Sequence, residues 1–173
     1  MVAESDSDLR PMRPTAAAAA LVEQADYPLY VVTAAADGVR SGCLVGFVTQ
    51  ASIEPARFIV CMSTVNHTTD VVARSNGLAL HALGACQHQL ASLFGEESGD
   101  WTDKFGDVSW TEGVTGAPIL SDCAAWLEGL VIGTMPAGDH RALLVEPVDG
   151  AAGGCRGHLF LSDAADISAG HPA

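Results

Sequence analysis

A hairpin signal near the amino terminus constrains the fold more than any other feature of the sequence. Valine, tyrosine and threonine residues flank Asp37-Gly38 within YPLYVVTAAADGVRSGCLVGFVTQ. An Asp-Gly pair suits the two-residue type I′ turn, because both central residues of that turn need positive φ. Strands joined by so short a turn are antiparallel, so the chain begins its sheet with an antiparallel pair.

The rest of the chain extends this pattern with few helices. Helical spacing and capping residues predict short helices at 16–25, 66–77 and 86–97. A long ordered loop with a helical turn near Lys104 is expected over 95–117. Further strands are expected at 56–63, 78–83 and 158–161, with a strand pair between 117 and 150 that turns at MPAGDH. No regular β-α-β alternation occurs, so we expect a mostly β fold with short helices, a Greek-key antiparallel barrel and not a Rossmann sheet.

Length and terminal composition bound the domain organisation. At 173 residues the chain suits one well-buried domain. We expect a flexible leader at 1–14, a single domain at 15–162 and a polar tail at 163–173. The first residues carry acids and prolines where a secretory signal needs basic and then apolar residues, so we expect a cytoplasmic protein.

Charge excludes several classes of function. The net charge is −13, with seven arginines and the single lysine Lys104. Nucleic-acid binding needs a basic surface, which this sequence lacks, so an anionic ligand must be held by neutral donors. The five cysteines are widely spaced and form no C-x-x-C pair, which favours buried free thiols. No H-x-x-x-H or H-E-x-x-H motif occurs, so we expect no metal site.

Familiar catalytic motifs are missing from the sequence. There is no G-x-S-x-G elbow, Walker motif or G-x-G-x-x-G loop. Asp139-His140 is a candidate acid–base pair, but adjacent strand residues point to opposite faces. We therefore interpret Asp139 as a turn residue beside a strand histidine.

Neutral hydrogen-bonding side chains follow two of the predicted strands. Thr49, Gln50 and Ser52 form one group, and Ser63, Asn66 and Thr68 belong to the other. Backbone N–H groups are free at strand ends, so such groups can cradle a phosphate without lysine. The same residues can also be ordinary caps and polar loops.

Segment 42–56, GCLVGFVTQASIEPA, resembles the core motif of the flavin reductase-like, FMN-binding split-barrel family. That motif runs glycine, any residue, threonine, small residues, an aromatic, then S-x-S-hydrophobic-D-P-P. Departures from it are Leu44, Gly46, Gln50 and Ala56. Later segments resemble the family in the same order, covering about 25–150: FIVCMSTVNHT, GLALHAL, LASLFGEESGDWTDKF, GAPILSDCAAWLEG, and GDH followed by LLVEPV.

The resemblance implies a set of site residues. Backbone along Val45, Gly46, Phe47 and Val48 would border the flavin ring, with Gly46 giving close access. The phosphate and ribityl chain would be held by Gln50, Ser52, Asn66 and Thr68, with Thr49 and Ser63 as further cofactor-binding residues. Lys104 would approach the phosphate or be a solvated loop lysine, and His140 would lie near flavin and nicotinamide or be structural.

The resemblance also implies a reaction. The family carries out hydride transfer from NADH or NADPH to flavin N5, so we expect an FMN reductase, with FAD as a second possible flavin. The reduced flavin would pass to a partner monooxygenase, and a homodimer is expected. The alternative is a flavoprotein that retains FMN as an electron carrier without turnover, and a deazaflavin or haem in the same groove stays open.

Overall fold

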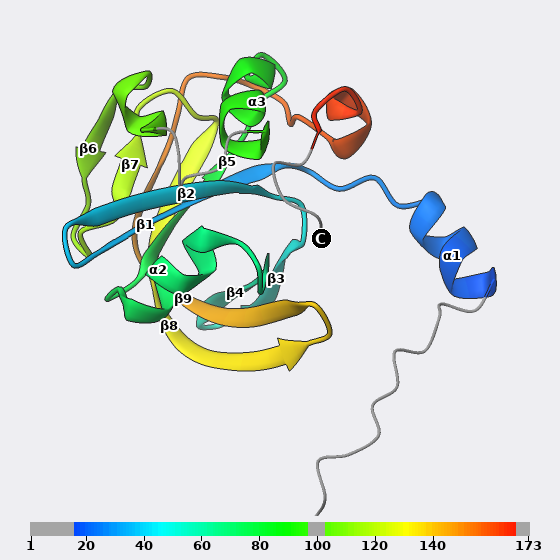
Figure 1. Ribbon diagram of the computed structural model, residues 1–173, viewed down its shortest axis with the longest axis horizontal. Coiled ribbons are helices and arrows are strands. Elements are labelled where there is room, and N and C mark those ends of the chain that lie inside the picture. The colour runs from blue at the N-terminus through cyan, green and yellow to red at the C-terminus, as the bar shows by residue number, and fades with distance from the viewer. Residues whose placement is uncertain (1–15, 97–102, 169–173) are drawn as a thin grey trace, which may run out of the picture.

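A computed structural model describes residues 16–96 and 103–168 (Figure 1). The helices are α1 (Ala16–Glu23), α2 (His67–Arg74) and α3 (His88–Glu96), with 3₁₀ turns η1 (Lys104–Gly106) and η2 (Leu161–Ala164). The strands are β1 (Tyr30–Ala36), β2 (Val39–Val45), β3 (Val48–Ile53), β4 (Ala56–Ser63), β5 (Leu78–Ala82), β6 (Trp110–Glu112), β7 (Pro118–Leu120), β8 (Ala125–Ala137) and β9 (His140–Ala152). The predicted mostly β architecture with short helices is confirmed.

One antiparallel sheet of seven strands makes up the body of the protein. Its order is β2-β1-β5-β8-β9-β4-β3, so β2 and β3 lie at its two edges although they follow each other in sequence. The sheet therefore has to curl until its edges come close enough for Gly46 and Phe47 to join them, and Figure 1 shows this curl. The result is a barrel that is open along one seam, as the expected antiparallel barrel requires.

The first hairpin has the predicted turn. Asp37 and Gly38 have φ values of 54° and 76°, as a type I′ turn needs. The register pairs Ala36 with Val39 and continues to Tyr30 with Val45.

The segment after this turn, however, does not form one continuous strand between residues 41 and 55. It breaks at Gly46-Phe47, and only the part before the break pairs with β1. The part after the break pairs with β4, where the amide of Cys61 donates to the carbonyl of Phe47. The break is thus the point where the chain leaves one edge of the sheet for the other.

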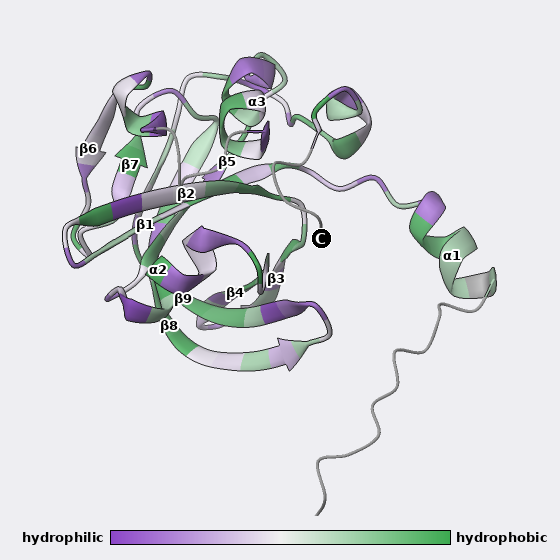
Figure 2. Ribbon diagram, in the orientation of Figure 1, coloured by the Kyte–Doolittle hydropathy of each residue, from purple (hydrophilic) through white to green (hydrophobic). Residues whose placement is uncertain are grey.

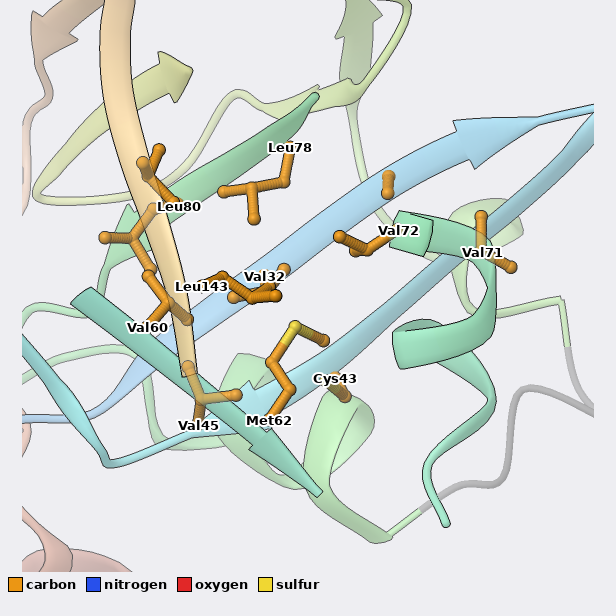
Figure 3. Close-up of a cluster of buried hydrophobic side chains, with 12 residues drawn as sticks. Val32, Cys43, Val45, Val60, Met62, Val71, Val72, Leu78, Leu80 and Leu143 are labelled. Carbon is orange, nitrogen blue, oxygen red and sulfur yellow. The ribbon is translucent and has the colours of Figure 1, made fainter. Parts of the chain in front are cut away.

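Two apolar cores lie on the two faces of the curled sheet. Figure 3 shows the first, inside the barrel, where Val32, Val60, Met62 and Leu143 converge with Val71 of α2. The second lies under α3, where buried Phe94 packs edge-to-face on Phe105. Because strand residues alternate between faces, β2 contributes Cys43 to the first core and Leu44 to the second.

Two predicted segments differ from the structure. The expected strand at 158–161 is only a single bridge between Pro28 and Phe160, because the chain turns at once into η2. The expected loop over 95–117 contains β6, which pairs with β7. The turn of this hairpin is held by the buried carboxylate of Glu128, which accepts from the amides of Val114 at 2.8 Å and Thr115 at 2.6 Å.

The expectation of free thiols is wrong for one pair of cysteines. Cys86 and Cys155 form a disulfide, with Cα atoms 6.6 Å apart across 69 residues of sequence. This pairing has no local spacing signal, because only the fold brings the start of α3 beside the loop after β9. Cys43, Cys61 and Cys123 are free, and burial raises the pKa of Cys43 to about 11.

The ends of the chain are described only in part. The predicted leader, 1–14, lies outside the described residues. Of the predicted polar tail, residues 163–168 are described; Ala164 is buried and Ile167 packs on the second core. None of the helices within the described residues is long and apolar enough to cross a membrane.

His81 provides a pH test of this fold. It is fully buried, its Nδ1 lies 3.1 Å from the carbonyl of Val31, and its Nε2 accepts from the amide of Leu120 at 3.0 Å. This arrangement needs a neutral ring with the proton on Nδ1. Burial accordingly lowers the pKa of His81 from 6.5 to about 4.

We predict that protonation of His81 destabilises the fold in mild acid. The folded-state pKa is depressed, so its stabilising effect is full above about pH 6.5 and is lost as pH falls toward 4, at a cost on the order of 3 kcal/mol. Urea unfolding at neutral pH and near pH 4.5 measures this loss. His81→Gln, which cannot titrate, should lose less stability between the two conditions; an equal loss would contradict the prediction.

Candidate functional site

The end of β4 brings together several of the predicted site residues. Ser63 is the cross-strand partner of His140, the first residue of β9. Phe47 lies beside them, with its ring centroid 5.3 Å from that of His140. The ring of Tyr27 meets Phe47 edge-on at 5.5 Å. We call this region the Phe47–His140 site, defined by Gly46, Phe47, Ser63, Asn66 and His140.

His140 is held in place by its neighbour in sequence. Its Nδ1 lies 2.7 Å from a carboxylate oxygen of Asp139, and its side chain is only 17% exposed. The prediction of a turn aspartate beside a strand histidine is confirmed, but the two side chains do not diverge, because strand alternation does not apply to a residue of the β8–β9 turn. The hydrogen bond and charge of His140 lower the pKa of Asp139. This contact leaves Nε2 as the ring nitrogen without a hydrogen bond to any described residue.

The start of α2 supplies amide and hydroxyl groups to the same region. Asn66 caps the helix, its side-chain oxygen accepting from the amide of Thr68 at 2.9 Å. Asn66 is tied to β4 because its own amide donates to the carbonyl of Ser63. Thr64 is bonded through its amide and its hydroxyl to the carbonyl of Asp139. The loop before α2 and the β8–β9 turn are therefore one connected unit.

Gln50 and Ser52 lie at the other end of the β3–β4 hairpin. Ser52 pairs with Arg57, six residues before Ser63 on β4, which places the two serines about 20 Å apart. The hydroxyl of Ser52 donates to the carbonyl of Pro55, and the Gln50 amide donates to the carbonyl of Ser52. One chain therefore cannot direct both predicted groups of donors at a single phosphate.

Four other predicted residues face the interior. Thr68 is buried and its hydroxyl bonds that of Ser41 at 2.9 Å. Lys104 is also buried, with its ammonium 3.2 Å from the carbonyl of Gly42 and 3.3 Å from that of Phe94. The side chains of Val45 and Val48 pack on the barrel core, so only their backbone faces the Phe47–His140 site.

Thr49 on β3 and Phe47, just before β3, face outward. Thr49 is exposed and lies opposite Ile59, between the Phe47–His140 site and the hairpin turn. Phe47 is 50% exposed, although it is a large aromatic residue. A half-exposed phenylalanine beside a histidine gives this surface an apolar platform for a flat ring.

Glycine at position 46 is not required by the protein itself. A Cβ atom there would meet only Leu29 at 3.7 Å and Tyr27 at 3.9 Å, which are ordinary contacts. Gly42 is different, since a Cβ atom would lie 2.7 Å from the ring of buried Phe94. Gly42 thus serves core packing, whereas packing does not require glycine at position 46, whose residue is only partly buried.

The polar groups of the Phe47–His140 site suit a flat ligand that carries an anionic end. The site residues include no lysine or arginine, and its polar groups are the Ser63 hydroxyl, the Asn66 amide and Nε2 of His140. Within the described ranges no group of three His, Cys, Asp or Glu side chains is arranged to hold a metal ion.

Two members of this surface could not be recognised from the sequence. Tyr27 precedes Pro28 and carries no motif, yet it packs on Phe47. Asp139 was not predicted to contact His140, because the side chains of adjacent strand residues point to opposite faces. That argument does not apply to Asp139, because it lies in a turn. The Asp-His dipeptide after a glycine was the one available signal for the pair.

Comparison with known families finds one whose match covers most of the chain. The family described as "Flavin reductase like domain" matches residues 23–162. The chain belongs to this family. The match contains both halves of the barrel and every residue of the Phe47–His140 site.

Curated relatives of this flavin reductase family member carry reductase names. The FMN reductase (NADH) RutF of Pseudomonas syringae is 29% identical over 119 residues, which are 69% of this chain and 66% of that protein. The reductase component of a 4-nitrophenol 4-monooxygenase/4-nitrocatechol 2-monooxygenase from Rhodococcus opacus is 31% identical over 123 residues, 71% of this chain and 64% of that one. The chain thus spans a little under two thirds of either relative.

Solved structures of the family have the same fold. The flavin reductase domain protein from Arthrobacter sp. FB24 superposes with a TM-score of 0.76 at 23% identity, covering 90% of this chain and 94% of that chain. The predicted flavin reductase-like split barrel is therefore confirmed.

We predict that alanine is tolerated at Gly46 and not at Gly42. Gly46→Ala should change the free energy of unfolding by less than about 0.5 kcal/mol, because its Cβ meets only ordinary contacts. Gly42→Ala should cost about 1–3 kcal/mol, because Phe94 is buried and cannot yield without disturbing the second core. Denaturant unfolding of both variants provides the comparison, and equal losses would refute it.

Proposed function

We propose that this protein is an NAD(P)H-dependent flavin reductase that uses FMN at the Phe47–His140 site. The observation that carries the proposal is the half-exposed ring of Phe47 beside the partly exposed backbone of Gly46 and the held ring of His140. Family membership and the reductase names of the relatives support it. FAD is the alternative flavin.

Each residue of the site has a distinct task in this proposal. The backbone at Gly46 and the ring of Phe47 receive the flat ring system, while Ser63 and Asn66 donate hydrogen bonds to the phosphate or ribityl chain. Asp139 fixes the His140 ring so that Nε2 faces the nicotinamide side. Bound flavin would supply the two-electron acceptor for hydride from the nicotinamide, so the protein needs to orient and desolvate rather than to provide a strong acid or base.

The proposal extends to a homodimer and a monooxygenase partner. Helix α1 projects away from the barrel in Figure 1 and is largely apolar in Figure 2, with Leu21 74% and Val22 63% exposed. Since an isolated eight-residue helix is marginal in water, a second copy is a suitable support for it. The reductase component from Rhodococcus opacus supports a monooxygenase as the consumer of reduced flavin. The compartment in this proposal is the cytoplasm.

A turnover assay tests the proposal directly. Purified protein is mixed with FMN and NADH or NADPH, and the loss of nicotinamide absorbance is followed. Oxidation that depends on both protein and FMN is expected. Tightly bound FMN without turnover would instead favour an electron carrier, and absence of FMN affinity would refute both.

His140→Phe tests the role of the free ring nitrogen. The substitution keeps an aromatic ring against Phe47 but removes Nε2 and the bond to Asp139. We expect kcat/KM for the nicotinamide to fall by about tenfold or more, which is about 1.4 kcal/mol, while FMN affinity changes less than about twofold. His158→Phe is the matched control, since His158 packs on Phe160 away from the site. Equal kcat/KM in wild type and His140→Phe would contradict the role.

Asn66→Asp distinguishes the two candidate phosphate positions. Aspartate keeps the cap of α2, so stability should be preserved, but its charge repels a nearby phosphate. FMN affinity should fall about tenfold, and affinity for riboflavin, which has no phosphate, should change less than about twofold. Ser52→Ala should leave both affinities unchanged. A loss of FMN affinity in Ser52→Ala alone would place the phosphate at the hairpin turn.

A further inference from the structure

A separate cavity of about 310 Å³ lies between α2 and the β8–β9 hairpin. Figure 1 shows α2 above this hairpin, at the open seam of the barrel. Because neighbouring strand residues face opposite ways, Arg141 lines this cavity while His140 faces the other side of β9. The lining combines apolar and polar side chains: Val72, Ala73, Val131, Leu143, Thr69, Ser75, Thr134 and Arg141.

Arg141 is the one charged side chain in the lining, and it has no ion pair or hydrogen bond with a described residue. Most other arginines within the described ranges have partners: Arg57 binds Glu146, Arg74 binds Asp37, and Arg40 stacks on Trp110 at 4.8 Å. Of the five described arginines, only Arg57 and Arg74 pair with a carboxylate. Arg141 and Arg156 are both exposed and have no such partner, but Arg156 lies on the loop after β9, whereas Arg141 lines the cavity.

The other polar groups of the cavity limit what can bind. The hydroxyl of Thr69 donates to the carbonyl of Ser63, and that of Ser75 donates to the carbonyls of Val72 and Gly77. Arg141 and Thr134 are therefore the side chains left to donate to a ligand. They suit one compact anionic group, and the remaining wall suits an apolar body.

We propose that this cavity binds a small monocarboxylate with an apolar body, of the aromatic acid type. The carboxylate would lie on the Arg141 guanidinium, whose forked donors match its two oxygens. The apolar body would pack against Val72, Val131 and Leu143. The cavity is at the lower end of the 300–1,000 Å³ range of ligand sites, so a dinucleotide is too large. The site is independent of the proposed reductase activity.

Calorimetric titration of the full chain with benzoate tests the proposal. Saturable binding to the wild type is expected, and Arg141→Gln should weaken it at least about tenfold by removing the charge. Arg156→Gln makes the same change in net charge away from the cavity and should alter the affinity less than about twofold. Absence of saturable benzoate binding, or equal affinity in wild type and Arg141→Gln, would overturn the proposal.

A second variant locates the ligand without touching the arginine. Ala73→Leu places a larger side chain in the cavity wall, at an exposed position of α2 where leucine is a good helix former. It should weaken benzoate binding at least about fivefold by occupying the apolar space. Unchanged affinity would mean that benzoate binds elsewhere. Benzyl alcohol and inorganic phosphate should each bind more weakly than benzoate, and equal affinity for either would overturn the assignment to an apolar monocarboxylate.

Discussion

The passage of the chain through Gly46-Phe47 is the constraint on which the rest of the structure depends. Strands β2 and β3 are consecutive in sequence and yet form opposite edges of one sheet, so the sheet can satisfy both pairings only by curling. The same passage turns Phe47 outward, beside the end of β4, where His140 and the start of α2 also arrive. The same break in the chain therefore curls the sheet into a barrel and places the residues of the site together.

The acidic composition determines how the few cations are used. The ammonium group of Lys104 donates to the carbonyls of Gly42 and Phe94 and so joins β2 to α3. It is therefore not available to a surface ligand. Arg57 and Arg74 are neutralised by carboxylates. The Phe47–His140 site is consequently built from neutral donors and one histidine, whose neighbouring Asp139 adds further negative charge.

The sequence predicted best what depends on short-range chemistry. The Asp37-Gly38 turn, the Asn66 cap of α2 and the apolar strand at 56–63 follow from local backbone preferences and hydrophobic pattern. Features that depend on distant partners were missed. The break at Gly46 needs two competing pairings, the Cys86–Cys155 disulfide joins remote segments, and the β6–β7 hairpin is fixed by Glu128 from another strand.

The site shows the same division between local and distant information. The strand-end donors were predicted as two groups, but the distance between the groups is a property of register: Ser52 pairs with Arg57 of β4, and Ser63 ends that strand. Two donor groups at opposite ends of one hairpin cannot hold one phosphate in a single chain. Either one group serves another purpose, as the local bonds of Gln50 and Ser52 indicate, or a second copy brings the two ends together. The geometry of one chain favours the end near His140, because there the donors lie beside the half-exposed ring of Phe47.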